Sequence, residues 1–498
     1  MTPMDASAMS RWERVLLPVF MLLVVGWRVY HAPNYPYHED EIGSIGVMRA
    51  IVETGRPLAE NGTLYWRSLL GHYLMAIPLF FAEVSPVSTR LVCILFSALL
   101  LPVVYAMGNR AAGKTAGWLA VLFLGFSAFE NLYASMARFY LPFQFFFVAA
   151  VYGAGEYFIA RRPGAGQWLL PATLGAIGTH ELAVELLPLF GLALLLGGHW
   201  RLLGKRSFQL GVALLALVGY ALLVYRPAAG FANPVAIPLE MFGLPDKAAF
   251  YQWFRQVTPL GATLLILGIY PLRREQNRLW AFYFLGFLYG LLLLTVVAPG
   301  DNPRYLSNLY PLGIVAVAAS LVWWGRWLAE RFRRGWRAAI PDPWVLGAVL
   351  VLAVGHLLVL ENLDVAKAFG GYFRFVDQRP AHEFIRERLL PGDLVISTEP
   401  GLSAFYLGRP VDYFLREKYD AEADRYLPFS AEEKTAIRTP FIDRPERLVE
   451  LLETDHRRIW LYTNWKITST VGVAMDEAIK RLFQPRFSRN ETYVLIRP

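Results

Sequence analysis

The sequence predicts a polytopic α-helical membrane protein with a C-terminal α/β domain, and composition is the first reason. Of the 498 residues, 55% are hydrophobic, 15% are aromatic and only 18% are charged, and the mean hydropathy is +0.36. A soluble protein of this length carries more charge and fewer apolar residues. The second and third reasons are a series of long apolar runs and the arrangement of basic residues between them.

Eleven apolar runs are predicted to cross a bilayer. A hydrocarbon core of about 30 Å requires about 20 helical residues, and sheltered helices are often shorter. The predicted spans are Val15–Tyr30, Arg90–Gly108, Gly117–Ser135, Pro142–Ala160, Gln167–Thr179, Leu182–Gly198, Ser207–Tyr225, Thr258–Leu272, Leu279–Ala298, Tyr305–Trp324 and Trp344–Leu360. The first run has no small-residue cleavage site, so we interpret it as a retained anchor.

A further apolar run, Leu69–Val84, is short and contains a His, a Pro and a Glu. If it does not span, one set of alternate loops carries nearly all the basic residues, and the opposite short loops carry little beyond Arg138 and Arg304. The basic set is Arg11, Arg14, Arg110, Lys114, Arg161, Arg162, Arg201, Lys205, Arg206, Arg273, Arg274, Arg278, Arg326, Arg331, Arg333, Arg334 and Arg337. The positive-inside rule assigns that set to the cytoplasm. We therefore predict that Leu69–Val84 lies along the outer membrane face, with the N-terminus inside and the C-terminus outside.

This topology divides the chain into a transmembrane module, residues 1–360, and a soluble extracytoplasmic domain, residues 361–498. An outer loop, residues 31–89, belongs to the first module and is expected to carry juxtamembrane helices. In the C-terminal part, the predicted strands are Asp393–Ser397, Arg458–Thr463 and Thr492–Arg497, and the predicted helices are Arg379–Leu390, Pro445–Leu452 and Val473–Leu482. The alternation of strands and helices predicts a small α/β layer domain.

Three acids follow the first span in the stretch YHEDEIGS, Tyr37–Ser44. A carboxylate at a membrane boundary is partly desolvated, and neighbouring carboxylates disfavour its ionised form. Both effects raise its pKa and make it a better proton acceptor. From this loop alone, two interpretations stay open: a catalytic base or a hydrated surface cluster.

The segment EDEIGSIGVMRAIVETGRPLAENGTLYWRSLLGHYL, Glu39–Leu74, resembles the first outer loop of the polyprenyl-phosphate-dependent C-type (GT-C) glycosyltransferases. It is most similar to the aminoarabinose transferases of lipid A modification and the protein O-mannosyltransferases. The shared features occur in one order and are Asp40-Glu41, Gly55 and Pro57, Asn61-Gly62, Tyr65 and Arg67. The next segment, Ser88–Leu124, is similar to the family's second and third spans. The resemblance implies a GT-C fold, and it covers the first third of the chain well and the remainder by architecture.

The resemblance also implies roles for the matching residues. Asp40 would be the general base that takes the proton of an acceptor hydroxyl as its oxygen attacks the anomeric carbon. Glu39 and Glu41 would hold the acceptor or tune Asp40. Arg67 matches a basic residue near the donor phosphate, which a guanidinium grips with paired donors, and Tyr65 is a candidate for substrate binding.

The second outer loop departs from the family pattern. Many C-type enzymes carry an acid there, sometimes in a metal site, but Ser135–Pro142 contains Arg138 and Tyr140 and no acid. We therefore expect no cofactor and a metal-independent site, with a divalent metal left open but unsupported by this loop. Arg138 is expected to face phosphate and Tyr140 to contact substrate. Glu130, the nearest acid upstream, is a candidate structural partner inside the third span.

Two other polar segments are candidates for substrate contact. His180, Glu181 and Glu185 lie between two short spans, where ionisable groups usually face a cavity, and the two glutamates would share a helix face. The alternative is a helix-capping histidine with a structural glutamate pair. Arg304 and Tyr305 open the tenth span, either beside a lipid phosphate, as in many C-type enzymes, or as an interfacial anchor.

A long outer segment, Arg226–Val257, carries the aromatic residues Tyr251, Trp253 and Phe254. They are candidates to line a sugar or prenyl groove, and interfacial anchoring is the alternative.

From these features we predict an inverting glycosyltransferase of the bacterial cytoplasmic (inner) membrane. It would move a sugar from a polyprenyl-phosphate donor to an extracytoplasmic lipid, polysaccharide or protein. The alternative is a membrane transporter or lipid flippase, although the sequence shows neither an inverted repeat nor a matching pair of broken spans. A sensor whose working part is the C-terminal domain is a third hypothesis. The basic residues are topology signals, so membrane lipid and not nucleic acid is the expected partner.

Overall fold

The computed structural model describes residues 10–199, 201, 205–206, 265, 267–275, 277–297, 303–335, 355, 376–417, 419–420, 425–426, 439–464, 471–489 and 491–497. The predicted spans Ser207–Tyr225 and Trp344–Leu360, most of Thr258–Leu272, and the Arg226–Val257 segment with Tyr251, Trp253 and Phe254 lie outside them. The chain forms two compact units. The helical unit comprises Met1–Ala32, Arg67–Arg226 and Asn233–Phe373, and the α/β unit comprises Pro33–Trp66, Pro227–Ala232 and Arg374–Pro498.

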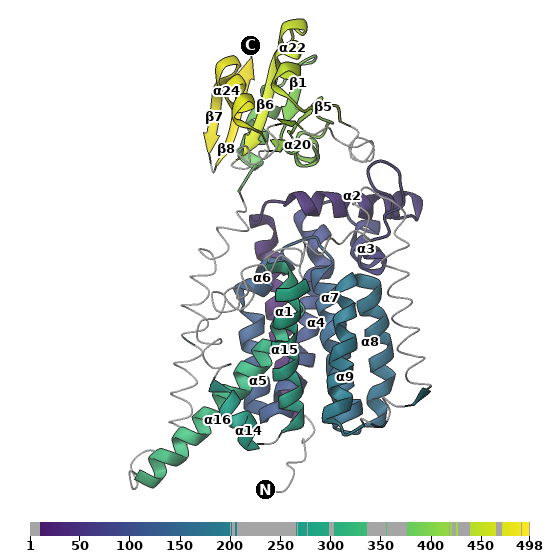
Figure 1. Ribbon diagram of the computed structural model, residues 1–498, viewed down its shortest axis with the longest axis vertical. Helices are drawn as coiled ribbons and strands as arrows, with labels where there is room; N and C mark the ends of the chain where they lie inside the picture. Colours follow the sequence, from purple (N-terminus) through teal and green to yellow (C-terminus); the bar gives the residue numbers. More distant parts are fainter. Residues whose placement is uncertain are drawn as a thin grey trace. The chain divides into compact units, whose positions relative to one another are not determined.

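Apolar helices build the helical unit. They are α1 (Arg11–His31), α3 (Leu69–Ala76), α4 (Pro86–Ala112), α5 (Lys114–Gly125), α6 (Ala128–Ala134), α7 (Tyr140–Ala154), α8 (Gly166–Thr179), α9 (Leu186–Leu196), α14 (Ile269–Glu275), α15 (Arg278–Val297) and α16 (Tyr310–Gly335). Helix α4 packs against α1, α5, α7 and α16 and is the central helix of the described bundle (Figure 1). Helices occupy all or part of every predicted span that falls among the described residues.

By length and composition, three helical segments of the described chain are able to cross a membrane: Arg11–Asn34, Pro86–Ala112 and Tyr310–Arg331. The pair α5 and α6, bent by 55°, would make a fourth. Helices α7, α8 and α9 fill predicted spans but have only 15, 14 and 11 residues. The count of eleven is therefore not reached among the described residues.

The Leu69–Val84 run forms α3, of 8 residues, followed by a 3₁₀ turn of 4 residues, Ile77–Phe80. Together they fall well short of the roughly 20 residues that a span requires. That this run lies along the outer membrane face stays a prediction.

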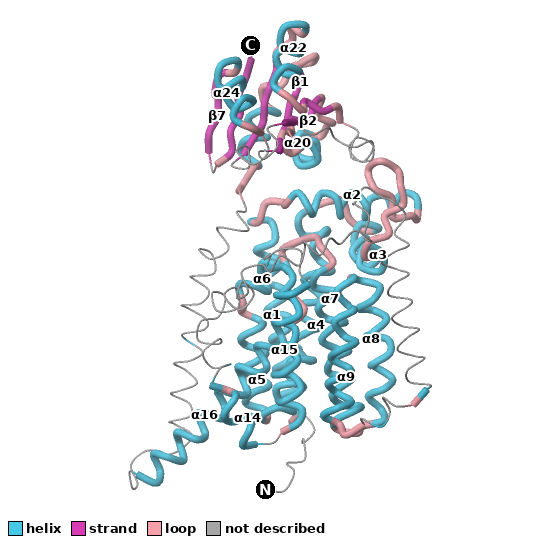
Figure 2. The backbone as a smooth tube through the Cα atoms, viewed as in Figure 1, coloured by secondary structure: helices cyan, strands magenta, loops and turns pink. Residues whose placement is uncertain are grey.

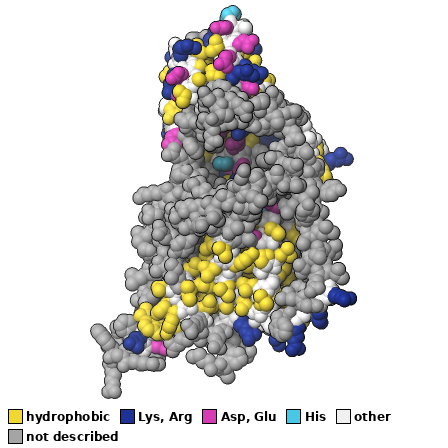
Figure 3. Space-filling view, in the orientation of Figure 1, with side chains coloured by type: hydrophobic (Ala, Val, Ile, Leu, Met, Phe, Trp, Pro, Cys, Tyr) yellow, Lys and Arg dark blue, Asp and Glu magenta, His cyan; other side chains and the backbone are white. Residues whose placement is uncertain are grey.

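Basic loops of the helical unit meet at one end of the bundle. Lys114, the first residue of α5, pairs with Glu13 near the start of α1 at 2.7 Å. Arg110, in the last turn of α4, pairs with Glu156 beyond the end of α7 at 2.8 Å. Further contacts at this end run from Arg161 to the carbonyl of Gly197, from Arg278 to that of Leu196 and from Arg326 to that of Ala112. Figure 3 shows a broad hydrophobic area on one face of the molecule, with Lys and Arg side chains along its lower edge. The loops that sequence analysis grouped by charge are thus grouped in space.

A buried arginine holds the bend between α5 and α6. Arg28 of α1 is 1% exposed, and it donates to the Asn131 side chain at 2.9 Å and to the Gly125 carbonyl at 3.3 Å. Because α5 ends at Gly125, that carbonyl has lost its helical partner. The charges of Arg28 and Glu130 also interact, so Glu130, which is 1% exposed, lies beside a cation.

The C-terminal residues form a six-stranded sheet in the order β5-β2-β1-β6-β8-β7, and Figure 2 shows strands only in the α/β unit of the described chain. The strands are β1 (Leu394–Ser397), β2 (Tyr413–Leu415), β5 (Phe441–Ile442), β6 (Ile459–Asn464), β7 (Gln484–Arg489) and β8 (Thr492–Arg497). Strands β5, β2, β1 and β6 are parallel, and β8 and β7 are added antiparallel. A separate pair joins β3 (Tyr419–Asp420) to β4 (Arg425–Tyr426).

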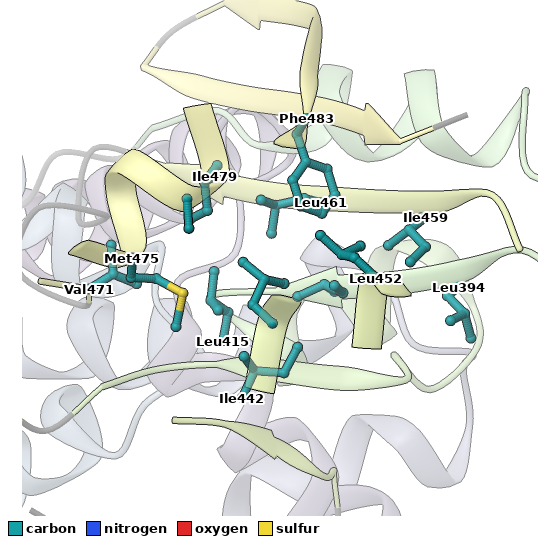
Figure 4. Packing of buried hydrophobic residues seen from close by; sticks show 13 residues of the cluster. Leu394, Leu415, Ile442, Leu452, Ile459, Leu461, Val471, Met475, Ile479 and Phe483 are labelled. Atoms are coloured by element: carbon teal, nitrogen blue, oxygen red, sulfur yellow. The ribbon is translucent and has the colours of Figure 1, made fainter. Parts of the chain in front are cut away.

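Helices cover both faces of this sheet. Alternate residues of β1 and β6 point to opposite sides. Leu394 and Leu461 belong to a core with α22 (Pro445–Thr454) and α24 (Val473–Leu482), drawn in Figure 4. Val395 belongs to the core on the other face, with α19 (Arg379–Arg386) and α20 (Pro400–Leu407).

The three strands predicted from sequence are β1, β6 and β8, and the three predicted helices are α19, α22 and α24. Sequence analysis missed β2 and β5, which have only 3 and 2 residues, and β7, an exposed strand with the polar sequence QPRFSR. It also missed α20, which starts at a Pro-Gly pair that we would expect in a turn.

The outer loop of residues 31–89 is divided between the two units. Helix α3 belongs to the helical unit, whereas residues 33–66, including α2 (Glu39–Thr54), group with the C-terminal residues. This grouping differs from the predicted boundary between residues 360 and 361, because α2 packs against α20.

Close backbone contact between α4 and α5 gives a stability prediction. A methyl group at Gly108 would lie 2.7 Å from the Ala116 carbonyl oxygen and 2.8 Å from the Gly117 Cα atom. Overpacking costs about 1–3 kcal/mol, so Gly108→Ala should lower the thermal unfolding midpoint in detergent. Gly191→Ala in α9, where nothing lies within 4 Å, is the control and should not lower it. An unchanged midpoint for Gly108→Ala would contradict the α4–α5 packing.

Candidate functional site

The three acids of the opening stretch lie in the first turn of α2, and one of them caps that helix. His38 is the N-cap residue, and its Nδ1 atom accepts from the Asp40 N–H at 3.2 Å. The Glu41 carboxylate accepts from the His38 N–H at 2.8 Å, which completes a capping box. Glu41 is fully buried, Asp40 is half-buried and Glu39 is exposed.

The three acids therefore differ in their contacts and in their exposure. The Glu41 carboxylate caps the N-terminus of α2 by accepting from the His38 N–H, so it has a structural partner. Asp40 keeps an accessible side chain in a turn where the helix dipole favours negative charge. Among the three, Asp40 and Glu39 are the carboxylates with solvent-accessible side chains.

The other residues of the resemblance form a compact turn after α2. Gly55 ends the helix with φ of 72°, and Gly62 has φ of 81°, a conformation that suits glycine. The Asn61 side chain accepts from the Thr63 N–H at 3.0 Å, and the Tyr65 N–H donates to the Pro57 carbonyl at 2.6 Å. These contacts explain the residue types by backbone geometry. Tyr65 is half-buried.

The predicted phosphate-binding arginines belong to the helical unit, and two of them lie against one aromatic ring. Arg67, just before α3, and Arg138, between α6 and α7, have their guanidinium carbons 5.8 Å and 4.7 Å from the Phe139 ring centre. Arg138 also lies 5.8 Å from the Tyr140 ring. Arg67 forms an ion pair with Glu181 at 2.7 Å.

His180 connects these residues to the third arginine. Burial is the main cause that lowers the pKa of His180. Glu181 raises it, the positive charges of Arg67, Arg138 and Arg304 lower it, and the net result is a pKa of about 4. All three predicted arginines therefore lie within electrostatic reach of one imidazole. We call Arg67, Arg138, Arg304, His180 and Glu181 the arginine cluster.

The His180 side chain also has a structural task. Its Nδ1 atom accepts from the Leu182 N–H at 3.0 Å and caps the 3₁₀ helix Glu181–Glu185. Its ring packs 4.9 Å from that of Phe143 and 5.1 Å from that of Phe139. With Nδ1 engaged, only Nε2 remains for a substrate.

The expectation that Glu181 and Glu185 share a helix face is wrong. They stand in a 3₁₀ helix and not in an α-helix, and residues four apart do not align at three residues per turn. Glu181 pairs with Arg67, while Glu185 accepts from the Asn308 amide at 2.8 Å. Burial raises the pKa of Glu181, but His180 and Arg67 lower it more, to about 2, so it is ionised at neutral pH.

Aromatic side chains surround the cluster. The Tyr140 ring lies edge-on to Tyr133 at 5.6 Å and 6.3 Å from His180, and Tyr133 is within electrostatic reach of Arg304. The Arg304 guanidinium lies 5.3 Å from the Tyr305 ring. Tyr140 and Tyr305 therefore both adjoin cluster residues.

Further polar residues lie inside the helical unit and were missed by sequence analysis. Gln144 donates to the Glu130 carboxylate at 2.5 Å and to the Ser307 carbonyl at 2.7 Å, and Asn308 contacts Glu185. Gln144 and Asn308 are 1% and 0% exposed. Gln144 lies inside the predicted span Pro142–Ala160. Because polar groups are costly in a membrane, its position could have indicated a polar partner inside the bundle.

The arrangement as a whole suits an anion. Arg67, Arg138 and Arg304 bring three guanidiniums near His180, and the ionised Glu181 carboxylate pairs with Arg67. The Arg67 and Glu181 side chains are 38% and 26% exposed, so an incoming phosphate can compete with Glu181 for Arg67. Across the part of the chain that the structure describes, no three His, Cys, Asp or Glu side chains are grouped as a metal site requires.

No protein-family model matches the sequence, and no curated protein matches it either. The structure is similar to that of ArnT from Cupriavidus metallidurans bound to undecaprenyl phosphate, with a TM-score of 0.61 and 14% identity over 99% of both chains. It is also similar to the archaeal oligosaccharyltransferase AglB from Archaeoglobus fulgidus in complex with an inhibitory peptide and a dolichol-phosphate. That match has a TM-score of 0.51 and 9% identity, and it covers 98% of this chain and 75% of that one. Both proteins are GT-C glycosyltransferases, and this chain has the GT-C fold.

Proposed function

We propose that the protein is a membrane glycosyltransferase that uses a polyprenyl-phosphate-linked sugar as donor. The observation that carries this proposal is the match over the whole chain to a structure with bound undecaprenyl phosphate. The arginine cluster supports it independently, because it supplies the charge that a lipid phosphate needs. The transporter and flippase alternative gains no support from these neighbours, which are transferases.

In this proposal, Arg67, Arg138 and Arg304 bind the donor phosphate. Paired guanidinium donors match phosphate oxygens and stay charged at all relevant pH values. When the bond between the anomeric carbon and the phosphate oxygen breaks, the electron pair remains on that oxygen. Arginines already in place stabilise the growing charge without reorganising. Arg67 exchanges Glu181 for phosphate as the donor binds.

Asp40 is proposed as the general base. It removes the proton of the acceptor hydroxyl while the hydroxyl oxygen attacks the anomeric carbon from the side opposite the phosphate, so that the configuration inverts. Glu39 is proposed to hold the acceptor, and Glu41 to act through the capping box. The acceptor is a lipid, a polysaccharide or a protein outside the cytoplasm.

Substrate contacts are proposed for residues beside these groups. Tyr140, Tyr305 and Tyr65 offer rings and hydroxyls to a sugar. His180 offers the Nε2 atom as a donor, because its Nδ1 accepts the cap hydrogen bond. Glu181 offers a carboxylate once Arg67 has moved to phosphate. No step requires a cofactor.

We propose the cytoplasmic (inner) membrane of a bacterium as the location, with the basic end of the helical unit in the cytoplasm. Helix α7 begins beside Arg138 and ends near Glu156, and α8 begins beside the α7 end and finishes at His180. The basic loops and the arginine cluster therefore occupy opposite ends of the same helices. By the positive-inside rule, we propose that the arginine cluster faces outside. The extracytoplasmic location of the C-terminal residues stays the prediction made from the sequence.

Substitution of Asp40 tests the base. Asp40→Asn keeps the size of the side chain but cannot accept the proton, so kcat/KM should fall by about 100-fold or more. The measurement is release of polyprenyl phosphate by protein in nanodiscs, given a panel of polyprenyl-phosphate sugars and a membrane extract as acceptor. Glu53→Gln, an equal change at an exposed position of α2, is the control and should keep its activity. Full activity in Asp40→Asn would remove Asp40 from this role, and turnover of no donor would count against the transferase itself.

Binding of the free lipid product tests the arginine cluster separately from catalysis. Arg67→Gln, Arg138→Gln and Arg304→Gln should each weaken binding of undecaprenyl phosphate by about tenfold or more, because a charged hydrogen bond contributes about 1.5–3 kcal/mol. Glu181→Gln should strengthen it, since Arg67 no longer has a competing partner. Fluorescence or calorimetric titration in detergent gives the Kd. Arg14→Gln, an exposed residue of the basic end, is the matched control, and equal Kd values for all five variants would contradict the assignment.

A further inference from the structure

Within the α/β unit, the C-terminal residues make several contacts with residues 33–66, the segment that carries Asp40. Residues 33–66 and the C-terminal residues form one compact unit, so these contacts lie within a single body. They involve the backbone at Pro33 and Asn34, the side chain and backbone of Tyr37, and helix α2 itself. We call each of these three sets of contacts an attachment.

The first attachment fixes the backbone that leads into α2. Arg379, at the start of α19, donates to the carbonyl oxygens of Pro33 at 2.8 Å and Asn34 at 3.4 Å. Its guanidinium is oriented by Asp377, which it contacts through Nε at 2.7 Å and through Nη2 at 2.9 Å. A planar fork held by a carboxylate has little freedom to turn, so the two carbonyls are held in place.

The second attachment lies three residues before Asp40. The Tyr406 hydroxyl of α20 accepts from the Tyr37 N–H at 3.0 Å, and the Tyr37 ring lies edge-on to Phe405 at 5.1 Å. Tyr37 is 6% exposed. Because Tyr37 immediately precedes the N-cap residue His38, this contact sets where the first turn of α2 begins.

The third attachment holds the helix along its length. A Cβ atom at Gly401 would be in ordinary van der Waals contact with the Ile42 side chain, at 4.0 Å. The Arg49 guanidinium lies 5.9 Å from the Phe405 ring. Gly401 and Phe405, which lie one turn apart on the same face of α20, thus contact residues two turns apart on α2.

Helix α20 is itself held firmly to the sheet. The Ser403 hydroxyl of α20 bonds to the Ser397 hydroxyl of β1 at 2.7 Å and to the Nε2 atom of His382 in α19 at 2.9 Å. All three residues are at most 1% exposed. Helix α20, against which α2 packs, is therefore fixed to the sheet by a buried polar network.

We propose that the α/β unit is a positioning element for the general base, in which Tyr406 and Arg379 hold residues 33–38 so that α2 presents Asp40 in one conformation. Tyr406 and Arg379 are positioning residues, because they act through the backbone before α2. This inference rests on the proposed function for the role of Asp40, but the attachment itself does not. The C-terminal residues then work as the support of the acid-bearing helix and not as an independent sensor.

Hydrogen exchange of the full-length protein in nanodiscs tests the attachment without any substrate. Tyr406→Phe removes only the hydroxyl that accepts from Tyr37, and Arg379→Gln removes the fork that binds Pro33 and Asn34. Each should speed exchange of amides 35–42 about tenfold, while strands β1 and β6 keep wild-type exchange. Tyr493→Phe and Arg386→Gln, exposed residues of β8 and α19, are matched controls and should change nothing. Wild-type exchange at residues 35–42 in both test variants would overturn the proposal.

Activity supplies the second measurement. In Tyr406→Phe, kcat should fall about tenfold with an unchanged KM for the donor, since the base is misplaced while the arginine cluster is intact. Arg379→Lys should recover part of the activity that Arg379→Gln loses. Faster exchange combined with wild-type kcat would overturn the positioning role. If no donor is turned over, the proposed function fails, and the exchange data still decide whether the α/β unit holds α2.

Discussion

The packing of three chain segments around Phe139 is the contact on which the arginine cluster depends. A methyl group at Gly71 of α3 would lie 2.8 Å from the Phe139 Cβ atom, so only glycine allows α3 to approach this closely. His180 packs on the same ring from the end of α8. Arg67 and Arg138 lie within about 6 Å of it. One aromatic side chain thus brings together charges from segments far apart in sequence.

Charged side chains buried in the apolar bundle have polar or oppositely charged neighbours, which offset part of their desolvation cost. Arg28 and Glu130 lie in the interior with hydrogen-bond partners from neighbouring helices. In the arginine cluster, by contrast, the ion pair of Arg67 and Glu181 is partly exposed, with 38% and 26% of the two side chains accessible. A ligand can therefore reach this pair, whereas Arg28 and Glu130 are each 1% exposed.

Structural and chemical tasks are combined in the same short segments. In α2, the residues around Asp40 form the capping box, and in the 3₁₀ helix after α8, His180 caps the turn that carries Glu181. A cap orders the backbone on which the reactive side chain stands. Sequence analysis weighed capping against chemistry for His180 as alternatives, whereas the geometry allows both because the cap uses only the Nδ1 atom of the ring.

Local apolar patterns, and the charges between them, were enough to predict the helical bundle, its basic end and the strands β1, β6 and β8. The candidate residues came from the resemblance to a family. That Arg67, Arg138 and Arg304 meet around His180, and that α2 packs against α20, became evident from the folded chain. The contact from Tyr37 to Tyr406 joins residues 369 positions apart, and such a pairing depends on how the whole chain packs, for which no local pattern exists.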